Sequence, residues 1–271
     1  MTRPRDVRGV ICEFECGYEF AGSPVMQELE RSVLGCDYGG TSWTTRLEAD
    51  RIARVLELDP KMRLLDVGAG SGWPALYLAK ISGCDVTVSD VPLSGLRAAV
   101  TRASIDGLGA RCRAVAANGA MLPFPDGSFE AVSHSDVLCC MPEKLSMLRE
   151  CRRVACDCAK MAFSVIVIAP LVEGSLRQVA IDSGPAFVES DDYAILLDQS
   201  GWRLLERRNI SNDFSQAMMA RIDGINARSS AISVVRGMDW VPEHLERLHA
   251  TLSAVQDGLL QREAFCAVAS E

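Results

Sequence analysis

The stretch LLDVGAGSGWPALYLAK, residues 64–80, decides the fold, because glycines stand at every second position directly after an apolar run. The apolar run predicts a buried strand, and the residues after the glycines predict a helix. Such a unit places backbone N–H groups and a helix N-terminus at the carboxyl edge of a parallel sheet, where ligands bind in open α/β folds. We therefore expect a ligand beside Gly68, Gly70 and Gly72.

Short apolar runs alternate with helical patterns after residue 63, which is typical of a parallel sheet covered by helices on both faces. We expect strands over 63–67, 85–89, 111–115, 129–133, 161–168, 202–210 and 264–269. The predicted helices cover about 24–34, 44–56, 72–81, 92–106, 143–156 and 191–199, and residues 214–258 are mainly helical.

No internal repeat, low-complexity segment or linker interrupts this pattern. We expect one domain over 1–271, in which residues 1–60 form an N-terminal helical cap and residues 61–170 form a cofactor-binding core. The C-terminal part, 171–271, is expected to carry a helical lid over about 214–258, inserted before the last strand.

The balance of charges favours a small-molecule partner. The chain has 28 Lys and Arg residues against 36 Asp and Glu residues, a formal net charge of −8, with no dense basic run, which argues against nucleic acid. The most apolar run, 161–172, contains Ser164 and Pro170 and is too short to span a bilayer, and the N-terminal residues lack a signal-peptide pattern. We expect no membrane insertion and a cytoplasmic location.

Eleven cysteines are many for a chain of this length, but their number is odd and their spacings do not form the paired C-x-x-C motifs of zinc sites. We expect them to be reduced and mostly buried, with no disulfide and no metal.

The glycine turn differs from a dinucleotide fingerprint, because Trp73 occupies the position of the third glycine. Asp90 ends the second predicted strand, where a carboxylate can accept hydrogen bonds from both ribose hydroxyls. Asp66 precedes the glycines and can face a cationic amino group. A ligand with a ribose and an amino-acid end matches these features.

Three motifs, LDVGAGSG, the acidic residue in VSDVP, and MLPFPDGSFEAVSHSDVL, resemble the class I S-adenosylmethionine-dependent methyltransferases over residues 63–168. The LPFPDGSF loop and the long insert resemble the small-molecule branch with the ubiquinone, sterol, tocopherol and phosphoethanolamine methyltransferases. The resemblance implies a Rossmann-like seven-stranded, mostly parallel sheet. It also implies S-adenosylmethionine as cofactor, S-adenosylhomocysteine as product, and methylation of a small, apolar or aromatic metabolite at O, N or C.

The resemblance also assigns cofactor contacts. Gly68, Ala69 and Gly70 would line the methionine part, Asp90 would hold the ribose, and Val91 would pack on adenine. Asn118 and Gly119 stand where relatives often carry an acidic pair facing the adenine amine, and the Asn118 carbonyl can still accept that hydrogen bond. The backbone carbonyl of Ser135 would meet the methionine amine.

Methyl transfer from a sulfonium depends mainly on positioning and on exclusion of water, so it needs a base only for some nucleophiles. His134 and Asp136 follow the fourth predicted strand, near the expected methyl position, and His134 is the candidate base; a supporting role in the loop is the alternative.

Aromatic and flexible side chains mark a candidate substrate roof. Tyr18, Phe20, Tyr38 and Trp43 belong to the N-terminal segment, of which residues 38–45 often fold over the cofactor in the resembling branch, and core packing is their alternative role. In the lid, Met218 is a candidate wall residue.

Two other functions remain open. One is a nicotinamide-dependent oxidoreductase, against which Trp73 argues, and the other is a protein that binds S-adenosylmethionine without transferring its methyl group. A nucleic-acid methyltransferase is disfavoured by the charge and by SHSD, 133–136, which stands in place of an NPPY-like tetrapeptide.

Overall fold

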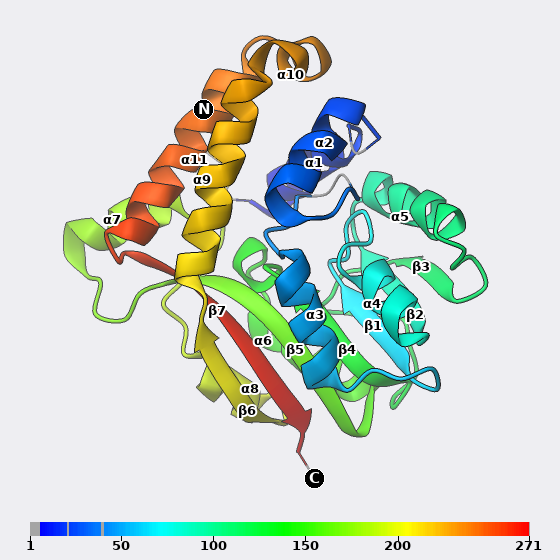
Figure 1. The fold of residues 1–271 in the computed structure, drawn as a ribbon. Coiled ribbons are helices and arrows are strands. Elements are labelled where there is room, and N and C mark those ends of the chain that lie inside the picture. The colour runs from blue at the N-terminus through cyan, green and yellow to red at the C-terminus, as the bar shows by residue number, and fades with distance from the viewer. Residues whose placement is uncertain (1–5, 21, 39–40, 271) are drawn as a thin grey trace.

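The computed structural model describes residues 6–20, 22–38 and 41–270. Within them, seven strands form one sheet in the order β3-β2-β1-β4-β5-β7-β6 (Figure 1). The strands are β1 Arg63–Val67, β2 Asp85–Asp90, β3 Cys112–Ala116, β4 Phe129–Ser135, β5 Ala155–Ile168, β6 Trp202–Asn209 and β7 Leu260–Ala269. β1 to β5 pair in parallel, whereas β7 is antiparallel to both β5 and β6. This topology confirms the predicted mostly parallel, Rossmann-like sheet.

Helices cover both faces of the sheet. The helices are α1 Val7–Tyr18, α2 Pro24–Leu34, α3 Arg46–Leu56, α4 Ala75–Ser82, α5 Leu93–Ile105, α6 Lys144–Val154, α7 Gly174–Ser183, α8 Tyr193–Gln199, α9 Ser211–Ala227, α10 Ser229–Arg236 and α11 Trp240–Gln256, with a short 3₁₀ helix, Leu138–Cys140. α3, α4 and α5 bury apolar side chains on one face, and α6, α7 and α8 do so on the other. Each face therefore has its own core.

The remaining helices gather beyond the carboxyl edge of the sheet. Figure 1 shows α9 and α11 side by side, joined through α10 at their far end, with α1 and α2 beside them. α2 packs on α9, and α1 packs on α5. The cap and the lid thus lie on the side of the sheet at which the glycine turn ends.

Most predicted elements are present, with shifted ends. β5 starts at Ala155 and β7 at Leu260, both earlier than their hydropathy indicates. The early part of β5 mixes buried and exposed residues in place of an apolar run, and it pairs with neighbouring strands at Ala155 and Lys160. The sequence pattern did not indicate α1 or α7. None of the described helices is long and apolar enough to cross a bilayer.

Candidate functional site

The turn after β1 folds back on the end of β2. Gly68, Gly70 and Gly72 have φ values of 68°, 52° and 94°, which side chains other than glycine adopt at a cost. The N–H groups of Gly68 and Ala69 donate to the carbonyl of Ser89, at 2.7 and 3.1 Å. These two donors serve the turn itself and are not aimed at a ligand.

Asp90 ties the turn to β2. Its carboxylate accepts hydrogen bonds from the backbone N–H groups of Gly70 and Val91, each at 2.7 Å. Burial raises the pKa of Asp90 to about 6, against the opposing effect of these two N–H groups. A carboxylate has about four acceptor positions, so two remain for a ligand.

Asp66 is the buried carboxyl group beneath the same turn. It is 2% exposed, and the Ser133 hydroxyl donates to it at 2.5 Å. Burial raises its pKa to about 7, Ser133 lowers it and the charge of Asp90 raises it further. A carboxyl group that titrates near neutrality gains most from a cationic ligand group, which would favour its ionised form.

α1 covers the turn. A Cβ at Gly70 would overlap the hydroxyl of Tyr18, and a Cβ at Gly95 would lie 2.9 Å from the Tyr18 ring and 3.0 Å from the backbone of Gly70. The buried Tyr18 hydroxyl lies 3.3 Å from the hydroxyl of Thr41. The two glycines therefore make room for one aromatic ring between α1, the turn and α5.

Glu15 holds α1 in this place. Its carboxylate accepts from the backbone N–H groups of Leu93 and Ser94, at 2.6 and 3.0 Å, at the start of α5. The Ser94 hydroxyl, with these N–H groups, lowers the pKa of Glu15, because all of them favour its ionised form. The sequence pattern indicated neither residue. Glu15 lies in α1, which was not predicted from the sequence, and the role of Gly95 depends on its contact with Tyr18 of α1.

The end of β4 also reaches the turn. The side chain of Val137 occupies the space that a Cβ at Gly68 would need. Asp136 has a left-handed backbone, with φ at 57°, and its N–H donates to the carbonyl of Ser164 at 2.8 Å. Ser135, which precedes it, is half-buried. The side chain of Asp136 is bound by Arg262, at 3.0 Å, so it is not a free base.

The His134 side chain lies on the face of β4 opposite to the face that carries Ser133. It is 0% exposed, its ring stacks on Phe163 at 4.6 Å, and within the described residues neither ring nitrogen has a hydrogen-bond partner. Burial lowers its pKa to about 3. The alternation of β4 places His134 among core side chains, away from Asp66 and Ser133, and this geometry does not favour its role as a base.

Of the three residues expected at adenine, Val91 is exposed, whereas Asn118 and Gly119 are engaged in contacts with neighbouring residues. Val91 is exposed at the start of the β2–α5 connection, beside Asp90. The side-chain oxygen of Asn118 accepts from the N–H of Ala120 at 2.9 Å, so it also serves its own turn. A Cβ at Gly119 would lie 3.0 Å from Val67, so close packing against Val67 accounts for a glycine at this position.

The candidate substrate residues separate into two groups. Tyr38 is buried, donates to Asp106 at 2.8 Å and packs on Trp73, on the side of α4 and α5. Trp43 instead packs edge-on against Phe214 of α9, at 5.1 Å.

Residues of the cap and the lid complete the second group. Arg236 lies over the ring of Phe20, and Arg221 lies over that of Trp43. Met218 is buried in the core that α9 shares with the sheet. Gly39 and Gly40, part of the segment expected over the cofactor, lie outside the described residues.

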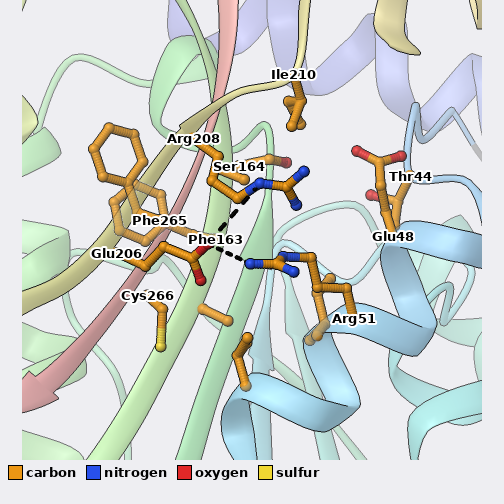
Figure 2. Close-up of a pocket in the computed structure, with 14 residues that line it drawn as sticks. Thr44, Glu48, Arg51, Phe163, Ser164, Glu206, Arg208, Ile210, Phe265 and Cys266 are labelled. Carbon is orange, nitrogen blue, oxygen red and sulfur yellow. Dashed lines mark hydrogen bonds and ion pairs between the residues drawn. The ribbon is translucent and has the colours of Figure 1, made fainter.

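A separate cavity of about 50 Å³ lies between α3 and strands β5, β6 and β7 (Figure 2). At its mouth, Glu206 pairs with Arg51 and lies 3.9 Å from Arg208. Figure 2 shows Glu48, Thr44 and Ser164 on its wall. The two arginines share one carboxylate, and the Arg51–Glu206 pair links α3 to β6 across the cavity.

Neither thiol nor metal chemistry marks the site. The structure gives all eleven cysteines as free thiols. Among residues 6–20, 22–38 and 41–270, no group of three or more His, Cys, Asp or Glu side chains is arranged to hold a metal ion.

Comparison with known proteins adds the family. Residues 65–163 match a family described as a methyltransferase domain. The chain is 29% identical over 171 residues to methyltransferase GfsG of Streptomyces halstedii. It is 31% identical over 163 residues to 27-O-demethylrifamycin SV methyltransferase of Amycolatopsis mediterranei. These matches cover 60% and 58% of this chain, and 60% of the length of each relative.

Solved structures share the fold at low identity. Phosphoethanolamine N-methyltransferase 2 of Haemonchus contortus matches with a TM-score of 0.79 and 15% identity, over 98% of this chain and 60% of that one. The [4+2]-cyclase SpnF matches with a TM-score of 0.71 and 21% identity, over 94% and 95% of the two chains. Residues 65–163 thus match a methyltransferase domain, and the three motifs and the sheet order are similar to those of the class I S-adenosylmethionine-dependent methyltransferases.

Proposed function

We propose that this chain transfers a methyl group from S-adenosylmethionine to an oxygen, nitrogen or carbon atom of a small, apolar or aromatic metabolite. The observation that carries the proposal is the bond between Asp90 and the N–H of Gly70, inside the region that matches a methyltransferase domain. This bond fixes a carboxylate beside the glycine turn, where it would accept hydrogen bonds from the ribose hydroxyls.

The residues of the edge fit this cofactor, which supplies a methyl group on a positively charged sulfur. Asp90 has two acceptor positions left for the ribose hydroxyls. The Asp66 carboxyl group, with a pKa of about 7, suits a cationic amino group. The turn from Gly68 to Gly70 would line the methionine part, and the Ser135 carbonyl would meet its amine.

Adenine would lie beyond the ribose. We propose that Val91 packs on its ring, with Asn118 and Gly119 beside it. Because Asn118 already accepts from Ala120, its carbonyl would give adenine a shared hydrogen bond rather than a dedicated one.

The substrate would enter between the cap and the lid. Tyr18, Phe20 and Trp43 belong to the first 60 residues, and Met218 lies on α9, buried in the core that this helix shares with the sheet; we propose these four as walls. We leave out Tyr38, because Asp106 and Trp73 hold it on the other side. In this arrangement one domain has a core, 61–170, covered by its first 60 residues and by its lid.

Catalysis would depend on positioning and on exclusion of water rather than on a base. Asp136 is engaged by Arg262, and His134 is sealed in the core. A neutral amine needs no base before it attacks a sulfonium, and a phenol can lose its proton to solvent before it binds.

The proposal includes three properties of the whole protein. The net charge of −8 supports a partner other than nucleic acid, and eleven free thiols support a reducing, cytoplasmic compartment. Cell fractionation and a binding assay with duplex DNA test these two. The third property is methyl transfer itself. It needs its own test because a protein named as a [4+2]-cyclase has a similar fold.

Turnover decides between methyl transfer and cofactor binding alone. Purified protein is first titrated with S-adenosylmethionine by calorimetry, and then incubated with it and a panel of phenols, amines and prenylated rings. We expect binding and, with at least one compound, stoichiometric S-adenosylhomocysteine and a product heavier by one methylene unit. Binding with no turnover across the panel and across metabolites that copurify would favour the second function.

A further inference from the structure

Arg262, near the start of β7, is a charged side chain with no access to solvent. It is 0% exposed, and it binds the carboxylates of two residues from distant parts of the chain. Its Nε lies 3.0 Å from Asp136 Oδ1, and its Nη1 lies 2.7 Å from Glu48 Oε1. Its Nη2 donates to the Ser164 hydroxyl at 3.1 Å. Every polar atom of the guanidinium is therefore used.

The two carboxylates hold elements that meet at the cofactor edge. Glu48 also accepts from the N–H of Thr45 at 2.6 Å, in the capping box that starts α3. Asp136 belongs to the connection after β4, and the next residue, Val137, lies against Gly68. Arg262 thus joins the start of α3 to the loop that presses on the glycine turn.

Stability alone is a weak reason for such a cluster. Buried ion pairs are often no more stabilising than apolar side chains of similar volume, because desolvation offsets their attraction. Here one arginine faces two carboxylates, so the cluster carries one negative charge in excess. Asp136 also has a left-handed backbone, which costs about 1 kcal/mol in a residue other than glycine and which the cluster must hold in place.

We propose that Arg262 is a positioning residue for the cofactor site: it fixes Asp136 in its left-handed conformation and so holds Val137 against Gly68. The inference rests on the proposed function, since it assigns Arg262 to the edge where S-adenosylmethionine would bind. Arg262 itself touches neither Gly68 nor Asp90 in the structure; it acts through Asp136.

A neutral version of the whole cluster separates positioning from folding. Arg262→Met alone would leave the partly buried carboxylates of Asp136 and Glu48 without their ion-pair partner and would endanger the fold. The triple variant Arg262→Met, Asp136→Asn, Glu48→Gln removes all three charges together, so it should unfold within a few degrees of the parent temperature. We expect its dissociation constant for S-adenosylmethionine to rise at least tenfold.

The matched control lies at the other end of the same strands. Arg63 on β1 and Glu130 on β4 form a salt bridge at 2.6 Å, away from the cofactor edge. Arg63→Met, Glu130→Gln should leave the dissociation constant within twofold. If the triple variant binds the cofactor like the parent, Arg262 has only a structural role and the inference is wrong. If the parent itself does not bind, the proposed function fails first and the inference with it.

Single variants at the Asp136 arm give a second readout that does not depend on the triple variant. Asp136→Asn keeps the shape and loses the charge, and we expect it to raise KM for the cofactor more than it lowers kcat. Arg262→Lys, a point charge that cannot bind two carboxylates through a planar fork, should fall between parent and triple variant in cofactor affinity. Equal KM values in Asp136→Asn and the parent would overturn the proposal.

Discussion

Asp90 and Gly70 are joined by a hydrogen bond of 2.7 Å from the Gly70 N–H to the Asp90 carboxylate, so the last residue of β2 closes the turn that follows β1. One carboxylate therefore shapes the turn and presents its remaining acceptor positions to a ligand. A substitution of Asp90 would therefore remove both the tie to the turn and the acceptor positions for a ligand.

Asp90→Ala should weaken S-adenosylmethionine binding by about 1–3 kcal/mol, because the ribose hydroxyls lose a charged acceptor and the turn loses a tie. Calorimetric titration measures this directly. Asp85→Ala, at the exposed opposite end of β2, is the control and should bind normally. An unchanged affinity in Asp90→Ala would remove Asp90 from the site.

Under the proposed function, Asp66 would make cofactor binding depend on pH. Its pKa of about 7 lies above the value of 3.8 in an unfolded chain, so its contribution to stability is fully present below about 3.8 and is lost as pH rises through 7. A cationic ligand group favours the ionised form. We expect the affinity for S-adenosylmethionine to rise about tenfold from pH 6 to pH 8.

Calorimetry at pH 6 in two buffers of different ionisation enthalpy should also detect proton release on binding. Asp66→Asn is the matched variant and should lose both the proton release and the rise in affinity. The same rise in Asp66→Asn as in the parent would assign the titration to another group.

Gly95→Ala tests the packing of α1 on the turn. Alanine is favoured over glycine inside a helix by about 1 kcal/mol, yet the added Cβ would lie 2.9 Å from the Tyr18 ring and 3.0 Å from Gly70. We expect weaker cofactor binding, by about 1–2 kcal/mol, because Tyr18 and the turn are pushed apart. Gly109→Ala, with open space around it, should change nothing. Normal binding in Gly95→Ala would mean that α1 yields without affecting the turn.

His134→Leu separates a core histidine from a catalytic base. Because neither ring nitrogen has a hydrogen-bond partner in the part of the chain that the structure describes, we expect kcat to stay within about threefold, whereas loss of a general base would lower it by about 10² or more. The dependence of kcat on pH should be the same in His134→Leu as in the parent. A hundredfold loss of kcat with unchanged cofactor affinity would restore His134 as the base.

Stability gives a second test of the same residue. The pKa of His134 falls from 6.5 to about 3, so its contribution to stability is present above 6.5 and is lost as pH falls towards 3. Relative to the parent, His134→Leu should therefore gain about 2 kcal/mol of unfolding free energy between pH 7.5 and pH 5, measured by urea denaturation at both values.

The sheet could be predicted from the sequence because its central strands β1, β2 and β4 are apolar and its helices have helical periodicity. The limits of β5 and β7 could not, since their added residues are held by backbone pairing that no local pattern announces. For the same reason the sequence placed Arg262 outside the last strand. A charged residue beside an apolar strand is ordinary in sequence, and only the topology brings Glu48 and Asp136 to it.

The cofactor edge was more predictable than the substrate side. Alternate glycines and a strand-ending aspartate constrain the backbone locally, so Gly68, Gly70 and Asp90 lie together as expected. His134 and Tyr38 show the opposite case. Both faces of β4 are buried, and the stacking of His134 on Phe163 depends on the neighbouring strand. The partner of Tyr38 is Asp106, 68 residues away.

The position of β7 also determines when the sheet can be completed during synthesis. It is synthesised after β6 but inserts between β5 and β6, so until it leaves the ribosome β5 keeps an open, apolar edge and β6 has no neighbour to pair with. Such an edge is a template for pairing with other chains. A nascent chain that ends before residue 260 can therefore pair β1 to β5 around the glycine turn, but it exposes the edge of β5 and leaves β6 unpaired, which favours aggregation.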